Sequence, residues 1–251
     1  MRYTFTIIIS LFSLVSIGQG LVPEIATSYV FSAPRGTMQQ NIKNANGVSV
    51  DFYLTPKEKR YSFGLEMAYN AYGHDKSRQN YTMEDGSVAP MDIIVNNGFF
   101  NMMLAGRYFL GGKTIKPFIT GKVGYSFFNT KLSIYDPNDL DQCEPVDADI
   151  LSKDATVIFS GGAGLRWDLL PKKCPGLLSV NVSANYSAGG KIDYMNVDAP
   201  NHSHATHTSD VYAQFINIQT QVVHEHHVGN VYSTSLEFLD FRIGGTVRLG
   251  K

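Results

Sequence analysis

Apolar and polar side chains alternate with a period of two along several segments of the chain. In segment 177–188 the even positions are apolar, and the odd positions from 179 onward are Ser or Asn. In segment 241–249 apolar or small residues hold the odd positions, and mostly polar residues hold the even ones. Successive side chains of a β-strand point to opposite faces. Each segment therefore predicts a strand with one apolar and one polar face.

Six further segments carry a similar pattern. The eight predicted strands are 26–33, 47–55, 61–71, 93–110, 115–135, 157–169, 177–188 and roughly 231–249. Their connections alternate between short ones (55–60, 111–114, 171–176) and long ones (34–46, 73–91, 136–153, 198–230). This alternation is typical of barrels that cross an outer membrane. We predict an all-β, eight-stranded antiparallel up-and-down transmembrane β-barrel with both termini periplasmic and long extracellular hairpins. The pattern leaves open whether 211–223 is a strand, a helix or a plug.

The first twenty residues have the features of an export signal. A single early charge, Arg2, precedes the apolar run 5–17, and Gly18-Gln19-Gly20 forms a small-x-small cleavage pattern. The alternative, a retained anchor, fits less well because about 20 apolar residues are needed to span a bilayer. We therefore expect a signal peptide at 1–20 and one barrel domain at 21–251, in the bacterial outer membrane.

Composition alone would suggest a soluble protein. Charged residues make up 17% of the chain, and the formal net charge is -1. Barrels escape hydropathy scans because lipid-facing and lumen-facing residues alternate and average out. The near-neutral charge also argues against a basic surface for nucleic acid.

Charges of both signs fall on the predicted inward faces. An eight-stranded barrel has an interior just wide enough for side chains to fill, so these charges should pair as a closed polar core. A narrow ion path is the alternative. The predicted luminal charge network comprises Asp51, Glu66, Arg107, Lys122, Arg166, Asp168, Asp240, Arg242 and Arg248.

Aromatic residues recur about eight positions apart on the outward faces. Eight residues of a tilted strand climb about 20 Å, close to the height of the apolar band of such barrels. The predicted aromatic girdles comprise Tyr61, Tyr69, Phe100, Tyr108, Tyr125, Phe159, Trp167 and Tyr186.

Six of the seven histidines fall in the last long connection. Imidazoles two residues apart in an extended chain point the same way and could bind a divalent metal such as Zn, Cu or Ni. A solvated loop without metal and a pH-responsive loop are the alternatives. The candidate metal ligands are His202, His204, His207, His224, His226 and His227. Apart from such a metal, we expect no cofactor.

The two cysteines fall on opposite sides of the predicted membrane. Cys143 lies in a long connection and Cys174 in a short one, with a whole strand between them. A disulfide needs α-carbons within about 7 Å, so we predict that these two residues are not bridged.

Catalytic signatures are weak. His224, Glu225 and Ser233 or Ser235 could be assembled into a hydrolase triad, but nothing in the sequence fixes their geometry. No nucleophile elbow, phosphate-binding loop or dinucleotide fingerprint occurs in a suitable context. We expect no enzymatic activity.

Three segments resemble the small outer-membrane β-barrel proteins of Bacteroidota, which have an OmpX- or OmpA-barrel-like shape. They are 28–36 (SYVFSAPRG), 117–125 (PFITGKVGY) and 241–244 (FRIG). The resemblance implies a surface protein, an adhesion-related protein or an accessory subunit of a larger membrane assembly.

Together these observations favour a non-enzymatic outer-membrane protein that presents long loops for contacts with proteins or surface ligands. The expected partners are outer-membrane lipid and lipopolysaccharide, and other outer-membrane proteins in a complex. The alternative is a narrow selective channel, or a metal-handling uptake component that uses the His-rich connection.

Overall fold

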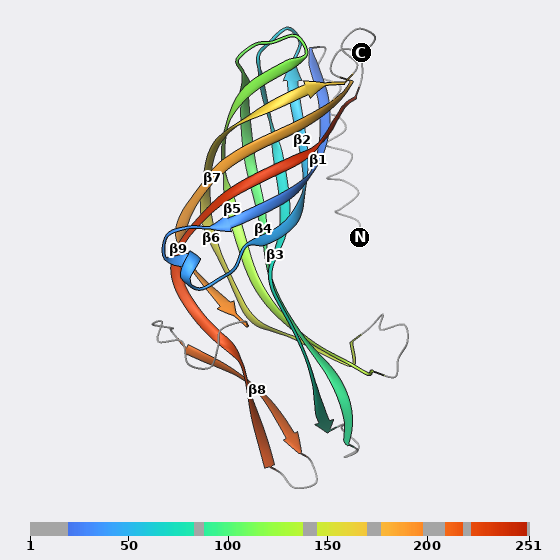
Figure 1. Ribbon diagram of the computed structural model, residues 1–251, viewed down its shortest axis with the longest axis vertical. Helices are drawn as coiled ribbons and strands as arrows, with labels where there is room; N and C mark the ends of the chain where they lie inside the picture. Colours follow the sequence, from blue (N-terminus) through green and yellow to red (C-terminus); the bar gives the residue numbers. More distant parts are fainter. Residues whose placement is uncertain are drawn as a thin grey trace, which may run out of the picture.

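A computed structural model of the chain describes residues 20–82, 88–137, 145–169, 177–197, 209–217 and 222–249. The predicted signal peptide and both cysteines lie outside these ranges, Gly20 excepted. The fold is all-β apart from one short 3-10 helix (Figure 1). Its elements are β1 (Leu21–Pro34), η1 (Gly36–Gln40), β2 (Ala45–Pro56), β3 (Tyr61–Thr82), β4 (Val88–Phe109), β5 (Ile115–Tyr135), β6 (Asp147–Asp168), β7 (Leu178–Asn196), β8 (Ser209–Asn217) and β9 (Val222–Arg248).

The strands close into an eight-stranded antiparallel barrel. Strands β1 to β7 pair in chain order, β7 pairs with β9, and β9 returns to pair with β1, for example at Ile25 opposite Val247. Strand β8 pairs with β9 alone and lies outside the closed ring. The predicted all-β fold with a closed, eight-stranded antiparallel barrel is confirmed. Within the described part of the chain, no helix has the length and hydropathy of a membrane span.

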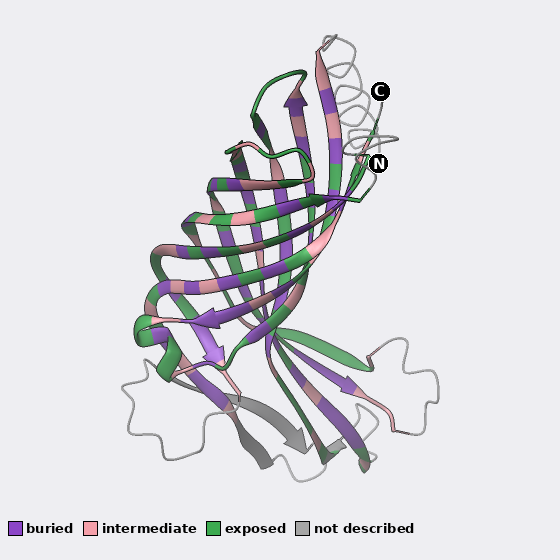
Figure 2. Ribbon diagram, turned by 45° about the horizontal axis from the view of Figure 1, so that its top comes forward, coloured by how far each residue is buried: buried purple, intermediate pink, exposed green. Residues whose placement is uncertain are grey.

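Burial alternates along the barrel strands, as the sequence pattern requires (Figure 2). On β5, Lys122 is 7% exposed and its neighbour Val123 is 43% exposed. The alternate positions that carry polar side chains face the interior, and those that carry apolar side chains face outward. This arrangement is the reverse of a soluble barrel with an apolar core.

Three of the predicted long loops are wrong. Much of 73–91 belongs to β3 and β4, β6 begins at Asp147, and the connection 198–230 contains β8 and the start of β9. The interpretation failed because it required one apolar face, whereas segments such as 73–80 and 147–154 are mostly polar on both faces. Segment 211–223, left open above, contributes to the β8–β9 hairpin where it is described.

These extensions form what we call the crown, which comprises 73–82, 88–97, 129–135, 147–155, 191–197, 209–217 and 222–235. Figure 1 shows them leaving the end of the barrel opposite the start of β1 and the end of β9, with β3 and β4 diverging from β8. The crown has an apolar core of its own, formed mainly by β4 and β5. Met91, Ile93, Val95, Leu132 and Ile134 are buried there, with Val197 and Val228 packed against them.

The opposite end of the barrel carries short connections. Residues 57–60 join β2 to β3, and 110–114 join β4 to β5. Gly112 has a φ of +99°, and an added Cβ would lie 1.9 Å from the carbonyl oxygen of Ile115, so this turn requires glycine. The predicted short connection 171–176 lies outside the described residues, between the end of β6 and the start of β7.

Candidate functional site

The lumen near the short turns is filled by a cluster of ion pairs around Glu24. Its carboxylate accepts from Arg166 Nη1 at 2.7 Å and from Arg248 Nη2 at 3.0 Å. Asp168 binds Lys116 Nζ at 2.6 Å and lies 3.4 Å from Arg166 Nε. Three of these five residues are in the predicted network. Sequence reasoning missed Glu24 and Lys116. Glu24 could have been found, because it lies two residues before the buried Ala26 on β1 and therefore points to the same inward face.

A second cluster lies deeper in the barrel around Glu66. Its carboxylate accepts from Lys122 Nζ at 2.9 Å and from an Arg242 guanidinium nitrogen. These three residues come from β3, β5 and β9, and all are at most 7% exposed. The structure therefore ties together distant strands through one buried carboxylate.

The remaining predicted luminal charges lie beside this cluster. Arg107 reaches Asp51 at 3.5 Å, and its guanidinium carbon lies 3.8 Å from the ring centroid of Tyr53, a cation–π contact. Asp240 accepts hydrogen bonds from Ser32 Oγ at 2.5 Å and Ser187 Oγ at 2.9 Å. Asp240 is thus held by hydroxyl groups, whereas an ion pair was expected.

Several buried polar atoms in this region have no hydrogen-bond partner among the described residues. They include Ser49 Oγ, Asp51 Oδ1, both side-chain polar atoms of Asn70, Asn101 Oδ1 and Ser126 Oγ, on strands β2 to β5. Asn101 and Ser126 are directly opposed across β4 and β5. Buried polar groups in folded proteins are usually paired with protein groups or with ordered water, so these atoms are the polar groups of the lumen that water would satisfy.

The lumen at the crown end is apolar, which corrects the prediction of a polar interior throughout. Phe99 stacks on Phe128 and on Phe238, with ring centroids 4.9 Å apart in each pair. We call this buried cluster the aromatic plug; it comprises Met38, Ile42, Ala45, Tyr72, Phe99, Met103, Phe128, Ile158, Ile192, Tyr194, Tyr232, Leu236 and Phe238. A signal for it was present, because adjacent phenylalanines at 99–100 and 127–128 put an aromatic ring on each face of their strands.

The connection between β1 and β2 completes the aromatic plug. Met38 of η1 is fully buried, and Ile42 follows it into the cluster. Asn41 Nδ2 donates to the hydroxyl of Tyr194 at 2.9 Å, and the Arg35 amide donates to the carbonyl of Glu237 at 2.9 Å. Met38 and Ile42 of this connection are therefore part of the barrel interior, whereas most of its other residues are exposed.

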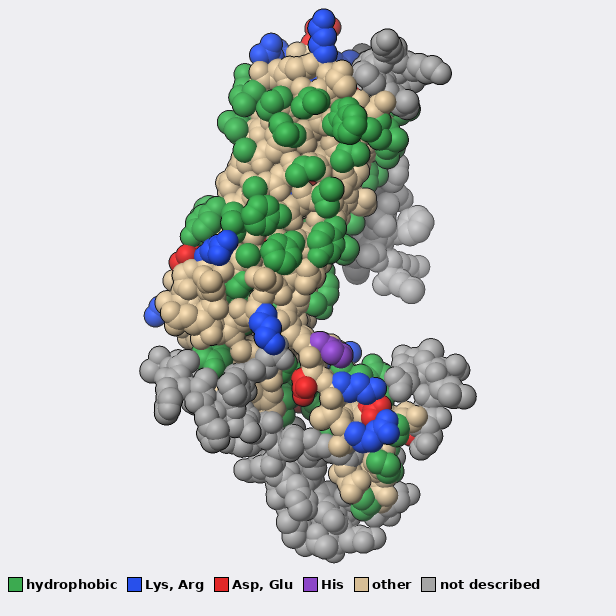
Figure 3. All heavy atoms as spheres, viewed as in Figure 1, with side chains coloured by type: hydrophobic (Ala, Val, Ile, Leu, Met, Phe, Trp, Pro, Cys, Tyr) green, Lys and Arg blue, Asp and Glu red, His purple; other side chains and the backbone are tan. Residues whose placement is uncertain are grey.

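The outside of the barrel is an apolar belt bounded by aromatic residues. Tyr61 lies opposite Tyr108, and Tyr69 lies opposite Phe100. On β3 and β4 these two aromatic pairs are therefore eight residues apart along each strand. Of the predicted girdle residues, seven are exposed and Phe100 is partly buried. Figure 3 shows apolar side chains over the barrel wall and Lys and Arg side chains at the end with the short turns.

The crown carries a salt-bridge cluster on the outward face of β3 and β4, in which Asp92 is buried and Lys76 and Arg78 are exposed. Asp92 accepts from Arg78 Nε at 2.8 Å and lies 2.9 Å from Lys76 Nζ. These hydrogen bonds, from Arg78 first and then Lys76, lower the pKa of Asp92 to about 2. The cluster links neighbouring strands of the hairpin well outside the apolar belt.

The histidine prediction falls largely outside the described residues. His202, His204 and His207 lie outside them altogether, and only the backbones of His224, His226 and His227 are described, within β9 and paired with β8. Among the side chains that are described, no group of three or more His, Cys, Asp and Glu residues is arranged to hold a metal ion. The metal site thus stays a prediction.

Comparisons with known proteins give similarity of fold only. No protein-family model matches the chain, and no curated protein matches it. Among solved structures, Neisserial surface protein A is 7% identical with a TM-score of 0.41, covering 92% of this chain and 97% of its own. A major outer membrane protein from Thermus thermophilus is 10% identical with a TM-score of 0.46 (91% and 99% covered). The outer membrane protease OmpT from Escherichia coli is 8% identical with a TM-score of 0.39 (92% and 97% covered). Likeness at this level supports no functional statement about this chain.

Proposed function

We propose that the chain is a non-enzymatic outer-membrane β-barrel protein whose sealed barrel anchors the crown at the cell surface for contacts with other proteins or surface ligands. The observation that carries this proposal is the reversed polarity of the barrel. Its wall exposes apolar side chains while its interior buries ion pairs such as Lys122 with Glu66. Such a wall is costly in water and favourable in lipid.

The crown supports a role in contacts. Strands β3, β4 and β6 each have 22 residues, and about 9 to 11 are enough to cross a bilayer. The remaining length builds hairpins with their own apolar core around Met91 and Ile93. A protein that needed only a membrane anchor would not require this ordered extension.

The lumen argues for an anchor over the alternative of a channel. Charges fill it at one end, and the aromatic plug fills it at the other. Polar passage would have to displace stacked rings such as Phe99 and Phe128. The alternative of metal uptake depends on histidines outside the described side chains.

The proposal is tested by locating the crown and by asking what it binds. One protease-cleavable peptide is inserted between β3 and β4, and in a matched variant the same peptide is inserted in the short turn at 110–114. In intact cells we expect cleavage of the first variant only, with the second cleaved after the outer membrane is permeabilised. The opposite pattern would contradict the proposed orientation.

The binding role is tested in the same cells. The full chain is extracted in mild detergent, and its native mass and co-purifying chains are compared with those of a variant in which 76–94 are replaced by an Asn-Gly turn. We expect the barrel to keep its folded, heat-modifiable gel mobility and to lose partners that the full chain retains. Identical partners for both variants, or a full chain that is always a lone protomer, would contradict a crown-mediated assembly.

A further inference from the structure

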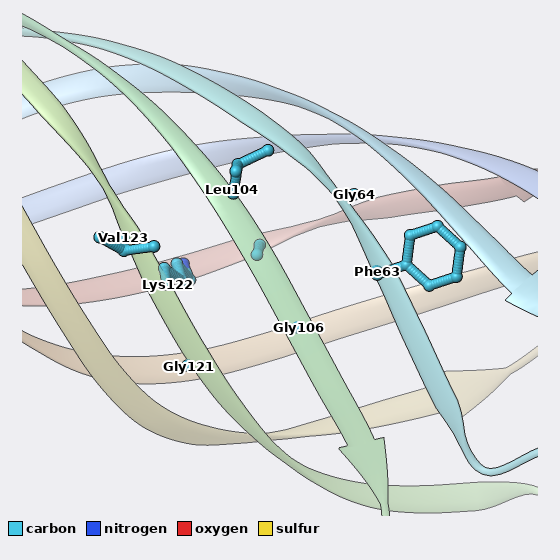
Figure 4. A pocket seen from close by; sticks show the side chains of 8 residues that line it. Phe63, Gly64, Leu104, Gly106, Gly121, Lys122 and Val123 are labelled. Carbon is cyan, nitrogen blue, oxygen red and sulfur yellow. The ribbon is translucent and has the colours of Figure 1, made fainter.

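A groove crosses the apolar belt on the outside of strands β3, β4 and β5. Its walls are the side chains of Phe63, Leu104 and Val123, and its floor is the backbone at Gly106 and Gly121 (Figure 4). The wall residues are all exposed, and Leu104 is 66% exposed. The groove is therefore an apolar hollow on the surface that faces lipid.

The floor of the groove is open because it lacks side chains. A Cβ added at Gly121 would have no heavy atom within 4 Å, and one added at Gly106 would meet only the carbonyl oxygen of Gly121 at 3.9 Å. These two glycines are directly opposed across β4 and β5. The space is one in which an extended apolar chain can lie against backbone.

Basic residues flank the groove on the side of the short turns. Lys57, Lys59 and Arg60 in the β2–β3 turn and Lys113 in the β4–β5 turn are exposed, with Glu58 the one acidic residue among them. The amide of Phe109, at the end of β4, donates to the carbonyl of Arg60 at 2.6 Å, which holds the first turn beside the strands that form the groove. This charge is complementary to an anionic headgroup.

The distance between the groove and the basic β2–β3 turn is short enough for a single lipid molecule to contact both. Phe63 pairs with Gly106, and Arg60 is three residues before Phe63. Three residues span about 10 Å along a strand, or roughly 8 Å of depth at about 40° tilt. Since the apolar band is about 25 Å tall, the groove lies within the leaflet next to the short turns.

We propose that this groove holds an acyl chain of an anionic phospholipid from that leaflet, with the headgroup phosphate against Lys59, Arg60 and Lys113. The inference rests on the proposed function, because it needs the belt to lie in a bilayer with the short turns at its surface. It assigns to the barrel wall a lipid selectivity that is independent of the crown.

Native mass spectrometry of the full chain, titrated with phosphatidylglycerol or phosphatidylcholine in mixed micelles, tests the proposal. We expect one phosphatidylglycerol molecule to be retained about tenfold more strongly than phosphatidylcholine. Gly121→Leu fills the groove and should abolish this retention. The matched control is Gly245→Leu, at an outward position on β9 where an added Cβ has only one atom nearby, at 3.9 Å, and it should retain the lipid.

The headgroup contact is tested by charge reversal. Lys59→Glu with Arg60→Glu should reduce phosphatidylglycerol binding to the level of phosphatidylcholine, whereas the crown control Lys131→Glu with Lys153→Glu should not. Equal binding of both lipids by the native chain, undiminished binding by Gly121→Leu, or a protein dimer that Gly121→Leu dissociates would each overturn the inference. A native chain that does not insert into vesicles would refute the proposed function as well, whereas an inserted chain without lipid preference would refute this inference alone.

Discussion

Single buried charges connect strands that are far apart in the sequence. Glu66 on β3 is fully buried and binds both Lys122 on β5 and Arg242 on β9. Glu24 binds Arg166 and Arg248 in the same way near the short turns. Because a charge that loses its partner in a buried site retains its desolvation cost, these carboxylates should contribute strongly to stability.

Replacing Glu66 by Gln should destabilise the barrel. The change keeps the shape of the side chain but leaves Lys122 and Arg242 without their counter-charge. Breaking a buried pair in this way costs roughly 3–5 kcal/mol of unfolding free energy. Urea unfolding in lipid vesicles measures the difference, with Asp75→Asn at an exposed crown position as the control. If Glu66→Gln changes the unfolding free energy as little as the control does, the ion pairs do not hold the barrel together.

Among the elements, the hairpin of β3 and β4 shows how one pair of strands serves two environments. Near the short turns its outward side chains, such as Tyr61 and Leu104, face the apolar belt. In the crown its outward face carries Asp92 with Lys76 and Arg78. The same backbone ladder continues through both parts, interrupted by one bulge between Ala71 and Gly73.

The crown part of this hairpin should loosen in acid. The pKa of Asp92 is lowered from 3.8 to about 2 by its hydrogen bonds, so the folded state favours the carboxylate. That stabilisation is present above about pH 4 and is lost as the pH falls through about 2. Hydrogen exchange of 88–97, corrected for intrinsic rates, should accelerate across this window. Asp92→Asn should remove the pH dependence, and a response unchanged in that variant would assign it to other groups.

Viewed as a whole, the molecule places two kinds of interior in series. Ion pairs such as that of Glu24 with Arg166 occupy the half near the short turns, and the aromatic plug occupies the half near the crown. Unpartnered polar atoms such as Asn101 Oδ1 lie at the depth of the plug, because Asn101 falls between Phe99 and Met103 on the inward face of β4. The closed state of the barrel therefore depends on the aromatic plug.

Conductance measured in planar bilayers should depend on whether the aromatic plug is intact. The native chain should show no single-channel steps, and Phe99→Ala should introduce brief openings because it removes a ring stacked on both Phe128 and Phe238. Phe127→Ala, which removes an outward-facing ring beside Phe128, should produce no single-channel steps. Stable steps from the native chain would favour the alternative of a narrow channel.

Alternation along the chain was enough to predict the barrel class, most of the strand positions in the belt and which charges point inward. It could do so because a bilayer outside and a polar lumen inside impose strict alternation, which is a local property of each strand. Burial of residues such as Glu66, Lys122 and Arg166 follows directly from that parity.

The folded structure was needed to show which charges meet, where the crown strands run and how the barrel is closed. Pairing of Glu24 with Arg248 depends on ring closure across the whole chain, and no local pattern encodes it. Crown segments such as 73–80 and 147–154 lack the one-sided apolar pattern, because both faces of a strand can be polar outside lipid. The aromatic plug combines β2 to β7 and β9 with η1, so its existence depends on strand stagger and on the path of a loop, which periodicity along one strand does not specify.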